Sequence, residues 1–250
     1  MESMKKETTM MTTATYLRAM HSDRADRGSA ILIRLLFAAF VALCLPSVAA
    51  AQTANLWIDN SGGNCTRQST AAGYGDAAAC ASMQAALAAC APGDTIRMKA
   101  GTYGAQTITA TKASPGCTII AEATTSLTGK LTTNGSWYEI QNIVGSGWEA
   151  TGSNITCRGC NFAGAQVDWG SGATNVSWVG GSLRNFSCGA GCDHGMGVFT
   201  LGSNLLIDGV TFDNIRGIGA AQGQHFEVIR VDGNINGLTI RKSTFTNNLT

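Results

Sequence analysis

The sequence predicts an all-β fold of short strands wound into stacked coils, and three observations support this prediction. Of its 250 residues, 44% are hydrophobic but only 13% are charged, and glycine occurs 31 times. This composition favours short strands and tight turns. A loose repeat of strand-like segments fills the second half of the chain, and an asparagine precedes several of the repeats. Repeated units of this kind stack to bury a continuous core.

Residues 1–51 have the organisation of a secretory signal peptide with an N-terminal extension. Arg34 precedes an apolar run from Leu35 to Leu45, and small residues follow up to Ala51. The apolar run is shorter than the ~20 residues that a helix needs to cross a bilayer. We therefore expect a secreted protein, extracellular or periplasmic, with no stable membrane insertion after cleavage. The folded domain is expected in residues 52–250.

The charge and cysteine content of the remaining chain limit the kinds of ligand and of cysteine chemistry that are expected. Residues 52–250 hold 11 Lys and Arg against 12 Asp and Glu, so they lack the basic footprint of a nucleic-acid-binding protein. They also hold eight cysteines, an even number that favours disulfides in an exported protein, although the sequence does not pair them. A zinc site is the alternative for Cys157-x-x-Cys160 with Cys188-x-x-x-Cys192.

The opening of this domain combines a strand, a helix and a second extended segment. A strand is predicted at Leu56–Ile58, and a helix at Ala77–Ala91 that ends at Pro92-Gly93. One face of this helix is expected to carry a packed stripe of Cys80, Met83, Leu87 and Cys90. The segment from Gly93 to Tyr103 alternates as a strand does and turns at a glycine.

The repeat begins beyond Pro115 and determines the predicted fold. Each of five segments has two apolar residues two positions apart, a small residue at a bend, and usually a further apolar residue. Because the core is constant while the spacing varies, we expect coils whose loops differ in length. Stacked coils would also align Asn154, Asn175 and Asn204 at one turn. The first apolar residues of the five segments are Tyr138, Ile155, Val176, Leu205 and Leu238.

From about Leu56 to Thr250, the chain resembles the right-handed parallel β-helix proteins of the pectin-lyase-like superfamily. The resemblance is most specific in Leu56-Trp57-Ile58, Ser82-Met83-Gln84-Ala85-Ala86-Leu87, Pro92-Gly93-Asp94-Thr95-Ile96 and Ala100-Gly101-Thr102-Tyr103. It implies an α-helix that caps the first coil, three sheets per coil and a glycan cleft along one sheet. The chain stops directly after a repeat strand, so we expect it to be the N-terminal part of a longer domain.

If the repeats form the second and third sheets, the segments between them form the first sheet and line the cleft. Arg230 and three acidic residues are then expected to point outward from this sheet. His194 and His225 are expected to enter its edge from loops. Trp148 or Trp169 either stacks on a sugar ring or fills the core. The acidic residues, which are substrate-binding candidates together with Trp169, are Glu149, Asp168 and Asp232.

The predicted function is β-elimination of a uronate-containing polysaccharide. This reaction needs a group that neutralises the carboxylate, a base and an acid. Arg230, or a calcium ion held by Glu149 and Asp168, would neutralise the carboxylate, and no other cofactor is expected. His194 or His225 would be the base. Residues 224–233 loosely resemble the Gly-Glu-x-Ile-Arg-Ile-Gly stretch of alginate- and chondroitin-type lyases, with Glu227 and Arg230 at matching positions, although no lysine matches the catalytic base of those lyases.

Two alternatives stay open at this level. A glycoside hydrolase of the same fold would use paired carboxylates, for which Asp168 and Asp193 are the candidates. Cys192-Asp193-His194-Gly195 resembles the Gly-His-Gly element of polygalacturonases, but their other acidic elements are missing. The second alternative is a surface β-helix that binds an acidic polysaccharide or another glycan without catalysis.

Overall fold

The computed structural model describes residues 52–188, 195–217, 226–232 and 235–248. The described residues belong to one compact unit of the chain, Ala51–Thr250. The predicted signal segment, residues 1–51, lies outside the described residues. Within the described part of the chain, no helix has the length and apolar character needed to cross a bilayer.

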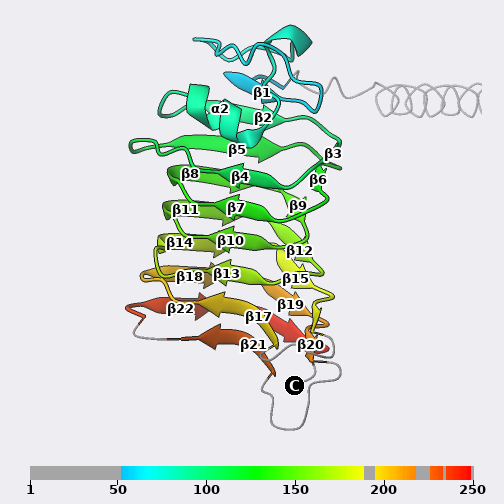
Figure 1. The fold of residues 1–250 in the computed structure, drawn as a ribbon, viewed down its shortest axis with the longest axis vertical. Coiled ribbons are helices and arrows are strands. Elements are labelled where there is room, and N and C mark those ends of the chain that lie inside the picture. The colour runs from blue at the N-terminus through cyan, green and yellow to red at the C-terminus, as the bar shows by residue number, and fades with distance from the viewer. Residues whose placement is uncertain (1–51, 189–194, 218–225, 233–234, 249–250) are drawn as a thin grey trace, which may run out of the picture. The chain divides into compact units, whose positions relative to one another are not determined.

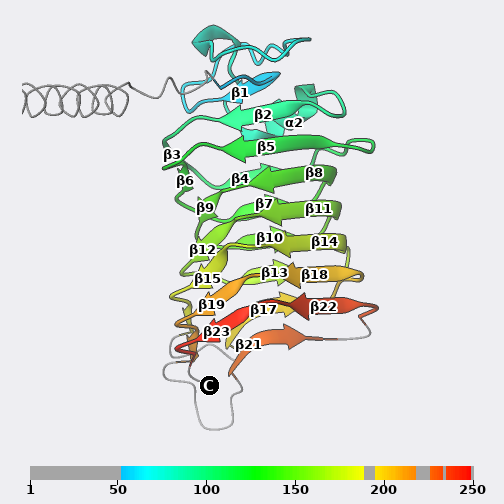
Figure 2. The same cartoon turned by 180° about the vertical axis from the view of Figure 1, so that it is seen from behind.

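Most of the regular structure in this unit is β-strand, and all but two of the strands belong to three parallel sheets (Figures 1 and 2). From Thr102 onward, the strands of these three sheets follow one another in a constant order, so that the chain winds repeatedly past all three. Neighbouring strands within a sheet pair in parallel. This arrangement is compatible with the expected parallel β-helix.

The strands have the following bounds. Sheet 1 consists of β4 (Gln106–Ile108), β7 (Leu131–Thr133), β10 (Trp148–Ala150), β13 (Val167–Trp169), β17 (Gly195–Thr200) and β21 (Phe226–Val231). Sheet 2 consists of β1 (Leu56–Ile58), β2 (Thr95–Met98), β5 (Cys117–Ala121), β8 (Ser136–Gln141), β11 (Ser153–Arg158), β14 (Thr174–Val179), β18 (Leu205–Asp208) and β22 (Leu238–Arg241). Sheet 3 consists of β3 (Thr102–Tyr103), β6 (Ser126–Leu127), β9 (Val144–Gly145), β12 (Asn161–Ala163), β15 (Ser182–Arg184), β19 (Thr211–Asp213) and β23 (Thr244–Thr246). The short strands β16 (Ser187–Cys188) and β20 (Arg216–Gly217) pair separately.

The strand register confirms the repeat that the sequence predicts. Ile155 pairs with Tyr138 on one side and with Val176 on the other, and Leu205 pairs with Leu238. These are the first apolar residues of the aligned segments, and all five lie in sheet 2. The segments between the repeats form the neighbouring strands β10, β13, β17 and β21 of sheet 1, also as predicted.

Asparagines form the predicted ladder where the strands of sheet 2 begin: Asn154 and Asn175 are the second residues of β11 and β14, and Asn204 directly precedes β18. Asn154, Asn175 and Asn204 have φ angles of 56°, 55° and 51°, in the left-handed region that asparagine tolerates better than most residues. The Asn175 side-chain amide donates to Asn154 Oδ1 at 3.0 Å. Stacked asparagines therefore have two effects here. They form a side-chain hydrogen bond between neighbouring coils, and they place a residue that tolerates a positive φ angle at each left-handed position.

Aromatic side chains fill the interior of the middle coils. Trp148, Trp169 and Trp178 are fully buried. The ring centre of Trp148 lies 5.3 Å from that of Trp169 and 6.3 Å from that of Trp178, both edge to face. Such contacts stabilise the core beyond the burial of apolar area alone.

The helix near the start of the domain is shorter than predicted. A 3-10 turn, η1, spans Asp76–Ala78, and the helix α2 spans Met83–Ala89, where the sequence predicted Ala77–Ala91. Cys80 lies before the helix because its backbone pairs with the strand β1 at Ile58. Ser82 then begins the helix, accepting a hydrogen bond from the Ala85 N–H. The predicted stripe is nevertheless packed, since its four members are 5% exposed or less.

Three disulfides join cysteines of the described region: Cys65–Cys80, Cys90–Cys117 and Cys157–Cys160. The zinc interpretation is therefore wrong for Cys157 and Cys160, because their sulfurs are bonded to each other. Cys192 lies outside the described residues.

Candidate functional site

One outward-facing column of side chains on sheet 1 carries several of the predicted site residues. In β10 and β13, the first and third residues are buried and only the middle residue faces outward. The register places Glu149 beside Asp168, Asp168 beside Phe199, and Phe199 beside Arg230. Because parallel strands lie about 4.8 Å apart, Glu149 and Arg230 are separated by roughly 14 Å along the column. We call this column the sheet 1 ladder; its members are Thr107, Thr132, Glu149, Asp168, Phe199 and Arg230.

Glu149 and Asp168 form a carboxylate pair on neighbouring strands of this ladder. Burial raises the pKa of Asp168 above 3.8, and the charge of Glu149 raises it further. Lys130 acts in the opposite direction but does not cancel these effects. Asp168 therefore holds a proton more readily than an ordinary surface carboxyl does, as a general acid must.

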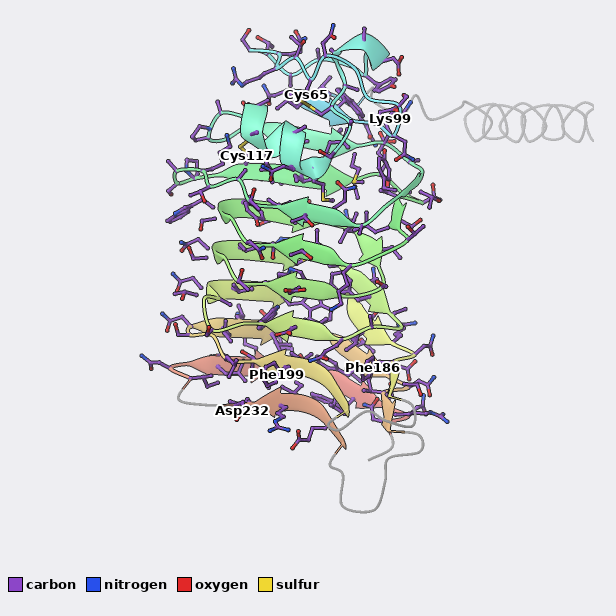
Figure 3. The ribbon with its side chains drawn as sticks, in the orientation of Figure 1. Cys65, Lys99, Cys117, Phe186, Phe199 and Asp232 are labelled. Atoms are coloured by element: carbon purple, nitrogen blue, oxygen red, sulfur yellow. A yellow bond between two sulfur atoms is a disulfide. The ribbon has the colours of Figure 1, made fainter. Side chains whose placement is uncertain are left out.

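Arg230, the cationic member of the ladder, lies between two carboxylates of its own segment. Its Nη2 atom is 3.4 Å from Asp232 Oδ2, and its Nε atom is 3.9 Å from Glu227 Oε2. Arg230 is 26% exposed, so its guanidinium is held by protein but still reaches solvent. Figure 3 shows Phe199 on β17 and Asp232 beyond the end of β21. The structure thus gathers Glu149, Asp168, Arg230 and Asp232 on sheet 1 or at its edge.

The expected sugar-stacking role of Trp169 is wrong, and so is that of Trp148. Both side chains are fully buried, because each stands at an inward position of a three-residue strand. Trp148 Nε1 donates to the hydroxyl oxygen of Thr133 at 2.9 Å inside the coil. The alternative, that they fill the core, is what the structure shows.

Phe199 takes the outward aromatic position, which sequence reasoning missed. It is partly exposed, and it lies between Asp168 and Arg230 in the ladder. Phe199 stands among apolar residues in the sequence, so nothing local marks it as a ligand-binding residue. Only its pairing with Asp168 identifies it, and this pairing is known only from the register of the strands.

Three predicted residues lie outside the described region: His194, His225 and Asp193. In the sequence, His194 directly precedes Gly195, the first residue of β17, and His225 directly precedes Phe226, the first residue of β21. Glu227, the acidic residue of the lyase-like segment, is on β21 beside Arg230.

Glu149 and Asp168 are the residues that would hold the calcium ion expected from the sequence. Carboxylate oxygens are the ligands that calcium prefers, and Glu149 and Asp168 bring two carboxylates to adjacent strands. In the described region, no group of three or more His, Cys, Asp or Glu side chains is placed to hold a metal ion. Because calcium takes roughly six to eight oxygen ligands, most of them here would come from substrate and water. The pair therefore fits a cation that bridges the protein and an acidic ligand.

Comparison with family models, curated proteins and solved structures gave no match.

Proposed function

We propose that this chain is a secreted carbohydrate-active protein, a right-handed β-helix of the pectin-lyase-like type with α2 as the cap of its first coil. Its ligand would be a uronate-containing polysaccharide that lies along the sheet 1 ladder and is cleaved by β-elimination. The observation that carries the proposal is the alignment of Glu149, Asp168, Phe199 and Arg230 on one partly exposed face. The three disulfides support secretion, since such bonds persist in oxidising compartments.

Two of the three groups that β-elimination needs have candidates in this chain, the base and the group that neutralises the carboxylate. A base removes the C5 proton, the C4–C5 double bond forms, and the bond from C4 to the leaving oxygen breaks as that oxygen gains a proton. His194 or His225 would be the base. Arg230 would bind the uronate carboxylate, and Phe199 would stack on a sugar ring. Calcium held by Glu149 and Asp168 would reduce the repulsion between these two carboxylates and the negatively charged glycan.

Hydrolysis is the second candidate reaction, favoured by the proximity of Glu149 and Asp168. Glycoside hydrolases use one carboxyl as an acid and a second as a base or nucleophile. The raised pKa of Asp168 suits the acid, and Glu149 would supply the second carboxylate. This pair replaces Asp168 and Asp193 as the better supported one, because the register places its members side by side.

A non-catalytic glycan-binding protein is the third candidate. It would use the sheet 1 ladder to bind the glycan and would need no catalytic base or acid.

One assay separates the three functions. The purified protein is incubated with alginate, polygalacturonate or chondroitin sulfate in the presence of calcium. Both the ultraviolet absorbance of unsaturated products and the reducing ends are followed. A lyase produces both signals, a hydrolase produces reducing ends alone, and a binding protein retards the polymer in affinity electrophoresis without cleaving it. Neither product nor binding with any of the three polymers would overturn the proposal.

A further inference from the structure

Trp137 differs from the other tryptophans of this chain in both exposure and backbone conformation. It is 36% exposed, and its φ angle is 63°. A bulky residue rarely adopts a positive φ, and backbone outliers of this kind cluster at functional sites. The other four tryptophans are at most 7% exposed: Trp57, Trp148, Trp169 and Trp178.

Trp137 occupies the first position of the asparagine ladder. The register of β8 with β11 places it beside Asn154, and Asn175 and Asn204 follow in the next coils. Asparagine suits the left-handed backbone of this column, whereas tryptophan does not. The preceding coil packs closely against the backbone of Trp137, since a Cβ atom at Gly116 would lie only 2.2 Å from the Trp137 carbonyl oxygen. The fold thus maintains a tryptophan where an asparagine would fit with less strain.

Trp137 lies close to the sheet 1 ladder along the chain. It is the second residue of β8, and it follows the ladder residue Thr132 by five positions, at most about 18 Å of chain. Asn134 lies between β7 and β8 and is exposed to solvent. The Thr151 hydroxyl donates to Asn134 Oδ1 at 2.8 Å, which directs the other end of that amide, its Nδ2 donor, away from Thr151. An indole and an amide donor are therefore both exposed within four residues of chain, directly after the ladder strand β7.

We propose that Trp137 is a carbohydrate-stacking platform at the edge of the sheet 1 ladder. A sugar ring of the bound polysaccharide lies on the indole face, and the Asn134 amide donates to one of its hydroxyl groups. An exposed indole combines a large apolar face with a polar edge, as a sugar ring does. This inference rests on the proposed function, because it adds one sugar position to a glycan bound along the ladder.

The test compares Trp137→Asn, which restores the ladder residue, with Trp137→Phe, which keeps a ring. Val144→Asn is the matched control, since Val144 is 44% exposed but belongs to sheet 3. Calorimetric titration with polygalacturonate should show about ten-fold weaker binding for Trp137→Asn and a much smaller loss for Trp137→Phe. Val144→Asn should bind as the wild type does. Because the strained backbone is relieved, Trp137→Asn should also melt about 2–4 °C higher.

Tryptophan fluorescence gives a second measurement. Polygalacturonate should protect the wild type and Val144→Asn from acrylamide quenching, and it should have no such effect on Trp137→Asn, whose remaining indoles are buried. Equal affinity of Trp137→Asn and the wild type would overturn the platform while leaving the ladder site standing. If the wild type binds neither polygalacturonate, alginate nor chondroitin sulfate, the proposed function fails and the platform fails with it.

Discussion

Glu149 and Asp168 stand side by side on neighbouring strands of sheet 1, and both face outward. Two carboxylates in adjacent positions repel each other, which costs stability unless a proton or a cation intervenes. Arranging like charges this way in a chain with so few of them is the strongest sign that sheet 1 serves a ligand.

The first prediction concerns the pH dependence of stability. The pKa of Asp168 is raised, so the native state binds this proton more tightly than the unfolded chain does, and the resulting stability is lost as the pH rises through the raised pKa. Asp168→Asn carries no such charge. Its stability relative to the wild type should therefore increase between acidic and neutral pH, as measured by urea unfolding.

Asp59 supplies the control with the opposite sign. Hydrogen bonds, first from the Ser61 side chain and then from the Tyr74 hydroxyl, lower the pKa of Asp59 to about 2. Its contribution to stability is present above the ordinary aspartate pKa of 3.8 and is lost as the pH falls toward about 2. Asp59→Asn should therefore be less stable than the wild type at neutral pH, by about 1 kcal/mol because solvent screens the site. Parallel pH profiles for the two variants would contradict the assignment.

The second prediction distinguishes two buried tryptophans. Trp148 Nε1 donates to Thr133, whereas Trp169 Nε1 is buried with no hydrogen-bond partner among the described residues. Trp148→Phe should destabilise more than Trp169→Phe by about 1 kcal/mol, because only the former breaks a buried hydrogen bond. Thermal and urea unfolding would measure this difference. A larger loss for Trp169→Phe would indicate that Trp169 has a polar partner after all.

The third prediction compares how much two of the disulfides contribute to the free energy of unfolding. Cys90–Cys117 closes a loop with a sequence separation of 27, against 3 for Cys157–Cys160. Loop entropy predicts that the double alanine variant at Cys90 and Cys117 loses about 3.5 kcal/mol, and the one at Cys157 and Cys160 about 2 kcal/mol. Equilibrium unfolding of both variants tests the order. The reverse order would mean that packing around Cys157 outweighs chain entropy.

The fourth prediction concerns metal removal. If calcium bridges the Glu149–Asp168 pair to an acidic glycan, a chelator should weaken the binding of polygalacturonate, and added calcium should restore it. The variant Glu149→Gln/Asp168→Asn should bind polygalacturonate with no response to either treatment. Calorimetric titration measures all four conditions. A chelator effect that persists in the double variant would place the cation elsewhere.

The coil architecture could be predicted because its signals are local. Asn154 before Ile155, repeated as Asn175 before Val176, marks the beginning of a strand, and Ile155 and Val176 are paired in sheet 2. The start of the helix could not be predicted, because Cys80 fits the helical period but is held by the strand β1. A long-range pairing of that kind leaves no local pattern.

The site was only partly predictable, for a related reason. Asp168 and Trp169 are adjacent, so one faces outward and the other inward, but a three-residue strand is too short for its pattern to decide which. The charge of Asp168 predicts that it faces outward, whereas the aromatic side chain of Trp169 is compatible with either face of the sheet. Phe199 became a candidate only through its pairing with Asp168, a contact between residues that are far apart in the sequence.

The glycan-binding face is identified most directly by comparing the glycan affinities of variants on two different sheets. Asp168→Asn/Phe199→Ala removes two adjacent members of the sheet 1 ladder. Ser177→Ala/Leu206→Ala changes the paired outward positions of sheet 2 that follow them along the chain. Calorimetric titration with polygalacturonate should show at least about ten-fold weaker binding for the ladder variant and unchanged binding for the sheet 2 variant. Unchanged binding by the ladder variant, or an equal loss in both, would contradict the assignment of sheet 1 as the glycan-binding face.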